Sequence, residues 1–263
     1  MTTATFRLAG RSQIIEASVN PSQNTADLNG RTIKPEQIKL DAPVTGTVYG
    51  TLLNYQGNLE ALSEALNQKP YYEPPKAPIL YIKPKNTWIG SGADILLPSD
   101  INELEVGASL GIVIEKTATR IKKQAAFDYI AGYTIVNDIS VPHFSFFRPA
   151  VKHKARDSFC PIGPWVVKKS AIENPDALTI RVFVNGEVMQ ENNTANLIRS
   201  VSKLLKDVTE FMTLYQGDVL LVGVPENAPL VRDQDLVRIE IEGIGALENR
   251  VISEERLFGG ASL

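Results

Sequence analysis

The pattern of hydrophobic and polar positions predicts a chain built mainly of strands. In the range Ala108–Ile114 every second residue is apolar, as expected for one buried face of a strand. The range Leu236–Ile244 also alternates, and we expect it to pair with Leu247–Ile252. Further strands are expected at Thr47–Asn54, Ile79–Lys83, Tyr133–Val136, Leu178–Val184 and Val219–Val222.

Helical patterns are few. Short helices are expected at Leu59–Leu66 and at Lys122–Ile130. A longer amphipathic helix is expected after the N-cap candidates Asn193 and Thr194. Its core-facing stripe would contain Leu197, Val201, Leu204, Val208 and Phe211. Because strands and helices do not alternate, the sequence predicts a mostly β fold of mixed (α+β) class and excludes a Rossmann sheet.

The first 45 residues are expected to form a small β appendage that packs on or caps the main domain. They contain short strand candidates at Thr5–Leu8, Gln13–Ala17 and Arg31–Ile33, with Asn29-Gly30 as a hairpin turn. No cluster of charged residues is visible there. The predicted division is therefore a β segment at residues 1–45 and a main domain at residues 46–263.

Composition narrows the class of protein. The chain has 263 residues, 43% of them hydrophobic and 22% charged, with a net charge of −3, which is typical of a soluble globular protein and gives no footprint for nucleic acid. No apolar run is long enough to span a bilayer, and the N-terminus lacks the apolar core of a secretory signal. A single cysteine fits a reducing cytoplasm, where we expect the protein to act.

The number of histidines limits the kinds of metal site that the chain can form. Two histidines, His143 and His153, are too few for a site built of histidine ligands. A divalent ion would therefore need oxygen ligands, which favours magnesium or calcium.

One stretch combines a buried strand with a cluster of charges. The strand predicted at Tyr133–Val136 ends at Asn137-Asp138, and Lys152, Lys154, Arg156 and Asp157 follow. With Lys83, these cations would form a pocket for a dicarboxylate. The alternative is a solvated loop whose charges pair at the surface with Asp157 and Glu115.

Seven segments, in order, resemble the fumarylacetoacetate hydrolase family from about Gly46 onward. They are YIKPKNTWIG (81–90), LGIVIEK (110–116), DYIAGYTIVND (128–138), KHKARDSFCPIGPW (152–165), VNGEVMQENNT (184–194), GDVLLVGVP (217–225) and IEIEGIGALEN (239–249). The resemblance implies rolled mixed β-sheets. It also implies a magnesium ion held by a Glu-x-Glu motif and an aspartate, beside a lysine that holds an oxo-acid substrate. Such an ion would stabilise an enolate.

Only part of that site carries over to this chain. By resemblance Asp138 falls on the metal-binding aspartate, Lys154 on the substrate lysine and Asp157 on the aspartate after it. The Glu-x-Glu positions, however, are Gly107 and Ser109. Mg²⁺ is therefore expected from the family but would have a single carboxylate here. Glu105, two residues before Gly107, would be the substitute ligand in a shifted site.

The loop that carries a histidine and a glutamate in hydrolytic members also differs. Its matching positions are Asn58 and Ala61, and asparagine cannot act as the general base of hydrolysis. Glu60 is either a substitute base or a solvated helix residue. Val224 stands where the family often has threonine, and this removes a hydroxyl donor. His153 is either a proton shuttle or a structural side chain.

The resemblance implies three hypotheses about function. In the first, the chain is an isomerase/decarboxylase subunit of 4-hydroxyphenylacetate (homoprotocatechuate) catabolism, acting through an enolate on a 2-oxo or 2-hydroxy-diene heptanedioate. Lys154 would be the electrostatic stabiliser and Asp138 the ligand or base. In the second, the chain is a degenerate paralogue that scaffolds a catalytic partner. The third is an acylpyruvate-type hydrolase, which Asn58 disfavours. A homodimer or a heteromer with a second family subunit is expected.

Overall fold

The computed structural model describes residues 1–143 and 149–259 and confirms a mostly β fold. Its large sheet contains β4 (Arg31–Ile33), β3 (Thr25–Leu28), β2 (Ile14–Asn20), β1 (Thr2–Leu8), β13 (Cys160–Lys168), β12 (Ile130–Asn137), β11 (Ala108–Ile114), β16 (Val219–Leu221), β6 (Val48–Leu52) and β7 (Ile79–Lys83), in that spatial order. In addition, β5 (Leu40–Asp41) pairs with β1 and β8 (Trp88–Ile89) pairs with β13.

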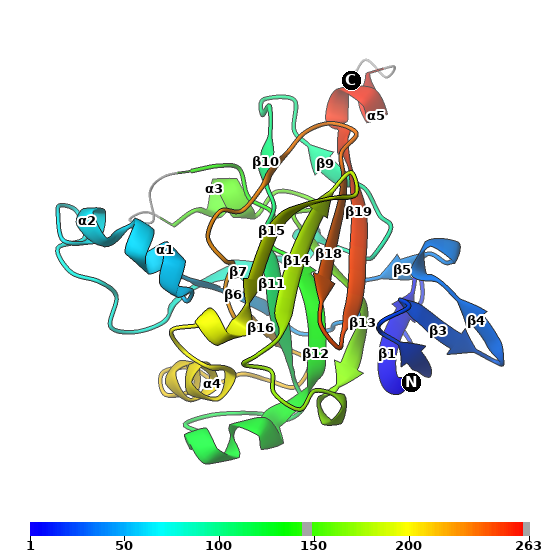
Figure 1. The fold of residues 1–263 in the computed structure, drawn as a ribbon, viewed down its shortest axis with the longest axis horizontal. Helices are drawn as coiled ribbons and strands as arrows, with labels where there is room; N and C mark the ends of the chain where they lie inside the picture. Colours follow the sequence, from blue (N-terminus) through cyan, green and yellow to red (C-terminus); the bar gives the residue numbers. More distant parts are fainter. Residues whose placement is uncertain (144–148, 260–263) are drawn as a thin grey trace.

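A second sheet packs against the middle of the first. It contains β15 (Glu187–Asn193), β14 (Thr179–Val184), β18 (Leu236–Ile241), β19 (Gly245–Ser253) and β9 (Ile95–Leu97), in that spatial order. Figure 1 shows β14, β18 and β19 lying across β11, β12 and β13, and these strands contact one another. The expected pairing at the C-terminal end is confirmed, because β18 and β19 are antiparallel neighbours. The core lies between the two sheets and includes Leu110, Ile112, Trp165, Ile239 and Leu247.

Two short strands and the central hairpin bring the site together. The strands β10 (Leu104–Glu105) and β17 (Leu230–Val231) form a small separate pair. The strands β11 and β12 are antiparallel, and Ala108 pairs with Asn137. The Asp138 N–H then donates to the Gly107 carbonyl at 2.8 Å. The end of β12 is thereby held against the start of β11, which places Asp138 beside the two positions where the family carries its glutamates.

The helices are shorter than the sequence pattern predicts. They are α1 (Gln56–Ala61), α2 (Ser63–Leu66), α3 (Val151–Lys154), α4 (Val201–Thr209) and α5 (Glu254–Phe258), with 3₁₀ turns at Pro35–Gln37, Lys85–Thr87, Lys123–Tyr129, Lys169–Ala171 and Thr194–Asn196. The helix expected at Leu59–Leu66 is therefore two short helices. The helix expected at Lys122–Ile130 is a 3₁₀ turn, and Ile130 already begins β12.

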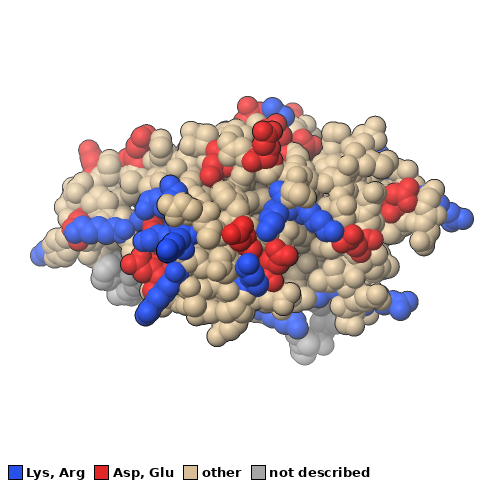
Figure 2. Space-filling view, turned by 90° about the horizontal axis from the view of Figure 1, so that it is seen from below, with Lys and Arg blue, Asp and Glu red and all other residues tan. Residues whose placement is uncertain are grey.

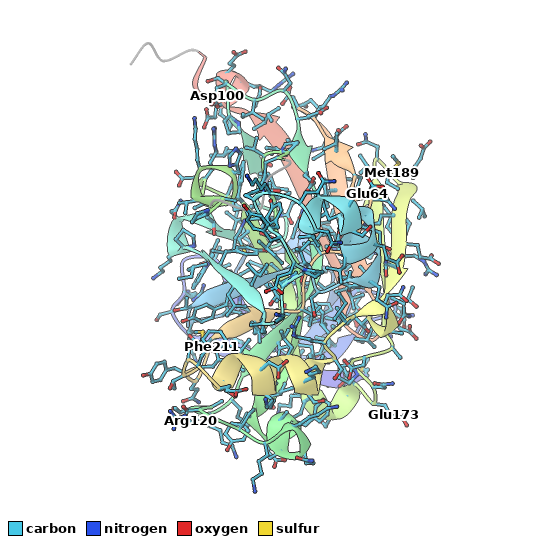
Figure 3. All side chains as sticks on the ribbon, turned by 90° about the vertical axis from the view of Figure 1, so that its left-hand side faces the viewer. Glu64, Asp100, Arg120, Glu173, Met189 and Phe211 are labelled. Carbon is cyan, nitrogen blue, oxygen red and sulfur yellow. The ribbon has the colours of Figure 1, made fainter. Side chains whose placement is uncertain are left out.

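The long amphipathic helix predicted after Asn193 was wrong in extent. Asn193 caps only a 3₁₀ turn, and Ser200 is the N-cap of α4. The intervening backbone is bound elsewhere, because the Ile198 N–H donates to the Asn54 carbonyl at 2.8 Å and cannot continue a helix. Phe211, expected on the core-facing stripe, lies beyond the end of α4 and is 60% exposed (Figure 3).

The first 45 residues continue the large sheet. The strand β1 pairs with β2 on one side and with β13 on the other, where Ala4 lies opposite Val167. Figure 1 shows this N-terminal part on the side of the molecule opposite α1 and α2. The boundary at residues 45 and 46 stays a prediction.

Charges of both signs share the surface. Lys, Arg, Asp and Glu side chains are interspersed on the face shown in Figure 2. On α4, Lys203 pairs with Asp207 at 3.0 Å and Lys206 pairs with Glu210 at 2.7 Å. In the part of the chain that the structure describes, no helix is long and apolar enough to cross a membrane.

Asn54 joins three segments of the fold. Its buried amide donates to the carbonyls of Arg199 (3.1 Å) and Val222 (2.8 Å), and its carbonyl accepts from the Arg199 N–H (3.0 Å). We expect Asn54→Ala to lower the free energy of unfolding by about 2 kcal/mol, because buried polar groups lose their partners. The exposed side chain of Asn67 makes one local hydrogen bond, to the Ser63 carbonyl. Asn67→Ala should therefore change the free energy of unfolding by less than about 0.5 kcal/mol. Equal effects of the two variants in urea unfolding would contradict this role.

Candidate functional site

Asp138 is the centre of the candidate site. It follows the last residue of β12 and is 1% exposed. Its Oδ1 lies 2.9 Å from the Lys83 Nζ, and its Oδ2 accepts a hydrogen bond from the Lys154 Nζ at 2.9 Å. The Tyr81 hydroxyl also donates to Oδ2. Both oxygens of this buried carboxylate are therefore engaged by ammonium groups of the chain itself.

Lys83 has no exposed surface and uses its whole ammonium group inside the protein. Besides Asp138, its Nζ contacts the carbonyl oxygens of Ile139 (2.9 Å) and Lys154 (2.7 Å). An ammonium has three N–H donors, of which two are donated to these carbonyls, and the Asp138 Oδ1 is its ion-pair partner at 2.9 Å. Burial lowers the pKa of Lys83, while the Asp138 carboxylate opposes that shift. The ion pair with the Asp138 carboxylate favours the protonated form, in which Lys83 is a buried positive charge beside Asp138.

Lys154 is the last residue of α3 and presents its ammonium to a cavity. Its Nζ lies 4.8 Å from the centroid of the Tyr81 ring, a distance that suits a cation–π contact. Within the described residues, the hydrogen bonds of this Nζ have one acceptor, Asp138. The remaining N–H donors are available to a ligand in the cavity that Lys154 lines.

Tyr81 is a site residue that sequence reasoning missed. It lies two residues before Lys83 on β7, so both side chains leave the same face of the strand. Gly50 is its partner on β6, and a Cβ at Gly50 would lie 2.0 Å from the Tyr81 Cζ. The spacing to Lys83 is visible in the sequence, but the glycine that makes room for the ring becomes apparent only with the strand register.

The pKa of Asp138 is lowered to about 2. Burial alone would raise it, but the charges of Lys154 and Lys83 outweigh burial, and the hydrogen bond from Tyr81 adds to them. Asp138 is therefore ionised at every working pH and is a weak base. Its position suits it to orienting Lys154 rather than to accepting a proton from a substrate.

The cavity above this cluster has a volume of about 160 Å³. Its lining contains Thr51, Leu52, Leu53, Asn58, Tyr81, Glu105, Asp138, His143, Lys154, Val224, Pro225, Asn227 and Ala228. Glu105 is held through its backbone, since it exchanges hydrogen bonds with Ser140 (2.8 and 3.1 Å). Burial raises the pKa of the Glu105 carboxyl, and the charge of Lys154 opposes this. Glu105 is thus a carboxyl group suited to proton transfer in the cavity.

The structure does not bring all the predicted binding residues together. Lys152 is exposed on α3. Arg156 forms an ion pair with Asp100 at 2.7 Å, and Figure 3 shows Asp100 near the α5 end of the molecule. Asp157 accepts a hydrogen bond from the Asn86 side chain at 2.7 Å. None of the three lines the cavity: Lys152 is on the exposed side of α3, and Arg156 and Asp157 lie beyond its end and are bound elsewhere. Of the four predicted cations, Lys154 lines the cavity, whereas Lys83 is enclosed beside Asp138 and does not line it.

The other residues that the sequence suggested for proton transfer are stacked, exposed or hydrogen-bonded within the protein. The ring of His153 stacks on that of His143, with centroids 4.9 Å apart. Glu60 is exposed. Asn58 lines the cavity but donates its amide to the Val224 carbonyl at 2.7 Å. A larger groove of about 740 Å³ lies between the N-terminal strands and β18, but both of its arginines are paired, Arg181 with Glu191 at 2.5 Å and Arg238 with Glu240 at 2.8 Å.

The donor set does not fit the family's magnesium ion. The Ser109 hydroxyl is buried and donates to the Gly223 carbonyl at 2.8 Å. A Cβ at Gly107 would lie 2.2 Å from the carbonyl oxygen of Asp138, so the backbone leaves no room for a glutamate. Among residues 1–143 and 149–259, no group of three His, Cys, Asp or Glu residues is placed to hold a metal.

Comparison with known proteins defines the class. The model of the fumarylacetoacetate (FAA) hydrolase C-terminal family matches residues 47–252. The chain therefore belongs to the fumarylacetoacetate hydrolase family. It is 43% identical over 210 residues to the 4-hydroxyphenylacetate degradation bifunctional isomerase/decarboxylase of Salmonella dublin. The match covers 80% of this chain and 48% of that protein. The chain thus spans about half the length of the curated relatives it matches.

Solved structures share the fold. The 5-carboxymethyl-2-hydroxymuconate delta-isomerase of Mycobacterium smegmatis is 29% identical, with a TM-score of 0.77 over 95% of this chain and 99% of that one. The maleylpyruvate hydrolase of Sphingobium sp. SYK-6, in complex with manganese (II) ion and pyruvate, is 23% identical, with a TM-score of 0.75 over 95% and 99%. At that identity the second likeness concerns the fold alone.

Lys83 should be required for stability. We expect Lys83→Met to lower the free energy of unfolding by about 3 kcal/mol or more, because it removes a counter-charge from a buried carboxylate. Lys85, two residues away, is exposed, and Lys85→Met should change stability by less than about 0.5 kcal/mol. Urea unfolding at neutral pH measures both. A Lys83→Met protein as stable as the Lys85→Met protein would show that the ion pair is not formed.

The same pair predicts a pH dependence. The pKa of Asp138 is lowered from 3.8 to about 2, so its contribution, about 2 kcal/mol, is present above pH 3.8 and is lost as pH falls through 2. Lys83→Met raises this pKa toward its ordinary value. The stability difference between wild type and variant should therefore shrink on acidification from about pH 4 to pH 2. A difference that stays constant over this range would contradict the assignment.

Proposed function

We propose that this chain is an isomerase/decarboxylase subunit of aromatic catabolism. Its substrate would be a 2-oxo or 2-hydroxy-diene heptanedioate of the 5-carboxymethyl-2-oxo-hex-3-ene-1,7-dioate type, from the breakdown of 4-hydroxyphenylacetate (homoprotocatechuate). The observation that carries the proposal is the ammonium of Lys154, oriented by Asp138 and Tyr81 at the wall of a cavity that also holds Glu105. Similarity to isomerases and to the isomerase/decarboxylase supports the class of reaction.

Lys154 would stabilise the negative charge that develops on the substrate. Both isomerisation and decarboxylation of a 2-oxo acid pass through an enolate, whose oxygen needs a positive or hydrogen-bond-donating neighbour. Asp138 and the Tyr81 ring fix the Lys154 side chain before substrate binds, so little reorganisation is needed during the reaction. Lys83, enclosed and fully bonded, would hold Asp138 and not touch the substrate.

Glu105 would move the proton. In isomerisation its carboxylate takes a proton from the carbon next to the conjugated system, which leaves a dienolate and a carboxylic acid. The same acid then returns the proton to a different carbon. In decarboxylation the bond to CO₂ breaks, its electron pair enters the enolate, and a proton from the acid form of Glu105 completes the product. Asp138, with a pKa of about 2, is a poor alternative for this role.

Activity should depend on Lys154 and not on its neighbour. We expect Lys154→Met to lower kcat on the heptanedioate substrate by about 100-fold or more, because the enolate loses its charged donor. Lys152→Met removes an equal charge from the exposed side of α3 and should leave kcat within about twofold. The loss of the ultraviolet absorbance of the conjugated substrate measures both. Equal activity of the two variants would refute the assignment of Lys154.

The pH profile should identify Glu105. A general base must be deprotonated, so kcat/KM should fall as pH falls through the Glu105 pKa, which burial raises above its ordinary value. We expect Glu105→Gln to lower kcat by about 100-fold and to remove this acidic limb. Glu103 is a matched control, because it pairs with Arg232 at 3.1 Å and does not line the cavity. An acidic limb that survives in Glu105→Gln would assign the proton transfer elsewhere.

A second candidate is a scaffold subunit whose partner carries out the chemistry. It is favoured by the missing carboxylates at Gly107 and Ser109. We propose that the chain assembles either as a homodimer or as a heteromer with a second family member. A scaffold needs the heteromer, whereas an enzyme can act as the homodimer. Turnover by the purified chain alone, abolished by Lys154→Met, would exclude the scaffold. Turnover that appears only with the partner, and is unaffected by Lys154→Met, would exclude the enzyme.

A further inference from the structure

The surroundings of Asp138 differ from those of a metal ligand. Asp138 stands at the family's metal-binding position, yet both its oxygens face ammonium groups. We infer that Asp138, whose two oxygens are held by Lys83 and Lys154, binds no divalent ion in this chain. The site then binds its anionic ligand with no metal at Asp138. The part of this inference that concerns substrate rests on the proposed function, whereas the part that concerns metal does not.

The net charge at Asp138 is the same whether the two glutamates and the ion are both present or both absent. Three carboxylates around a divalent ion carry three negative charges and two positive ones, a net charge of −1. Asp138 alone, with Gly107 and Ser109 at the other two positions, also carries −1. Loss of the two glutamates and loss of the ion therefore compensate each other. The lysines beside Asp138 face the same net charge in both arrangements.

A metal ion cannot bind Asp138 without displacing Lys83. The Lys83 ammonium has no exposed surface and is enclosed by Asp138 and two backbone carbonyls. An ion at Asp138 would leave that ammonium buried beside a second cation, which is strongly unfavourable. Magnesium also keeps most of its water unless carboxylates replace it, and Asp138 offers one carboxylate already in use.

The missing cage cannot be restored by side-chain motion alone. A Cβ at Gly107 would lie 2.2 Å from the Asp138 carbonyl oxygen and 2.8 Å from its carbon, both of them backbone atoms. The contact arises because the end of β12 is bonded to Gly107 itself, with the Asp138 N–H donating at 2.8 Å. In this chain the backbone at the contact between Asp138 and Gly107 therefore leaves no space for a longer side chain at position 107.

Direct metal binding tests the inference. The free Mn²⁺ signal in electron paramagnetic resonance should be unchanged when the purified chain is titrated with Mn²⁺ to about 1 mM. The midpoint of thermal unfolding should not move on adding Mg²⁺. If the chain turns over substrate, dialysis against EDTA should leave kcat within about twofold.

Saturable binding of one Mn²⁺ per chain would overturn the inference if the Lys83→Met/Asp138→Asn double variant loses it. This variant removes the Lys83 ammonium together with the carboxylate, so no unpaired charge is left at position 83, while Lys154 keeps its place at the cavity wall and the candidate ligand is gone. Binding that the double variant retains would lie away from Asp138 and would agree with the inference. No substrate is used in the titration, so an inactive chain would refute the proposed reaction and leave the metal result intact.

Discussion

The ion pair between Asp138 and the wholly buried Lys83 is the interaction on which this site depends. A carboxylate with 1% exposure is stable only with counter-charges, and Lys83 and Lys154 supply them at 2.9 Å each. Lys83 in turn binds the carbonyls of Ile139 and Lys154, which ties β7 to the chain after β12 and to α3. One buried ammonium thus positions three segments that are far apart in the sequence.

The two lysines have different roles because their surroundings differ. Lys83 has a full set of oxygen partners and no contact with solvent, so it acts on the site only through Asp138. Lys154 lines the cavity and is restrained by the Tyr81 ring, so it is placed to meet a negatively charged ligand. Glu105 completes a pair of opposite charges across the cavity. Such a pair is a suitable arrangement for forming and protonating an enolate.

Sequence reasoning predicted the parts of the fold that alternation controls. The strand Ala108–Ile114 was predicted with the bounds it has, because its apolar positions recur every second residue. The helix predicted beyond Asn193 was too long, because the apolar stripe gives no sign of the hydrogen bonds that Asn54 makes with Ile198 and with Arg199, the latter 145 residues away. Contacts between segments so distant have no local signal.

The site, too, depends on contacts between segments that are distant in the sequence. Asp138 and Lys154 were predicted because they lie in recognisable segments, and Lys83 was named as a binding residue. The enclosure of Lys83 depends on its contacts with Asp138 and with the carbonyls of Ile139 and Lys154, which are distant in the sequence. The position of Tyr81 depends on Gly50 in the neighbouring strand. The resemblance singled out Lys154, whereas Lys152 and Arg156 were added as binding residues on their charge alone. Of the three, only Lys154 is buried against Asp138, and charge in the sequence does not show which side chain points inward.

The most direct test of the central claim is a crystal structure of the chain grown with Mn²⁺, with anomalous diffraction recorded at the manganese edge. We expect no anomalous peak at Asp138 and an ammonium of Lys83 in contact with its Oδ1. A peak bound to Asp138, with Lys83 turned away, would contradict it.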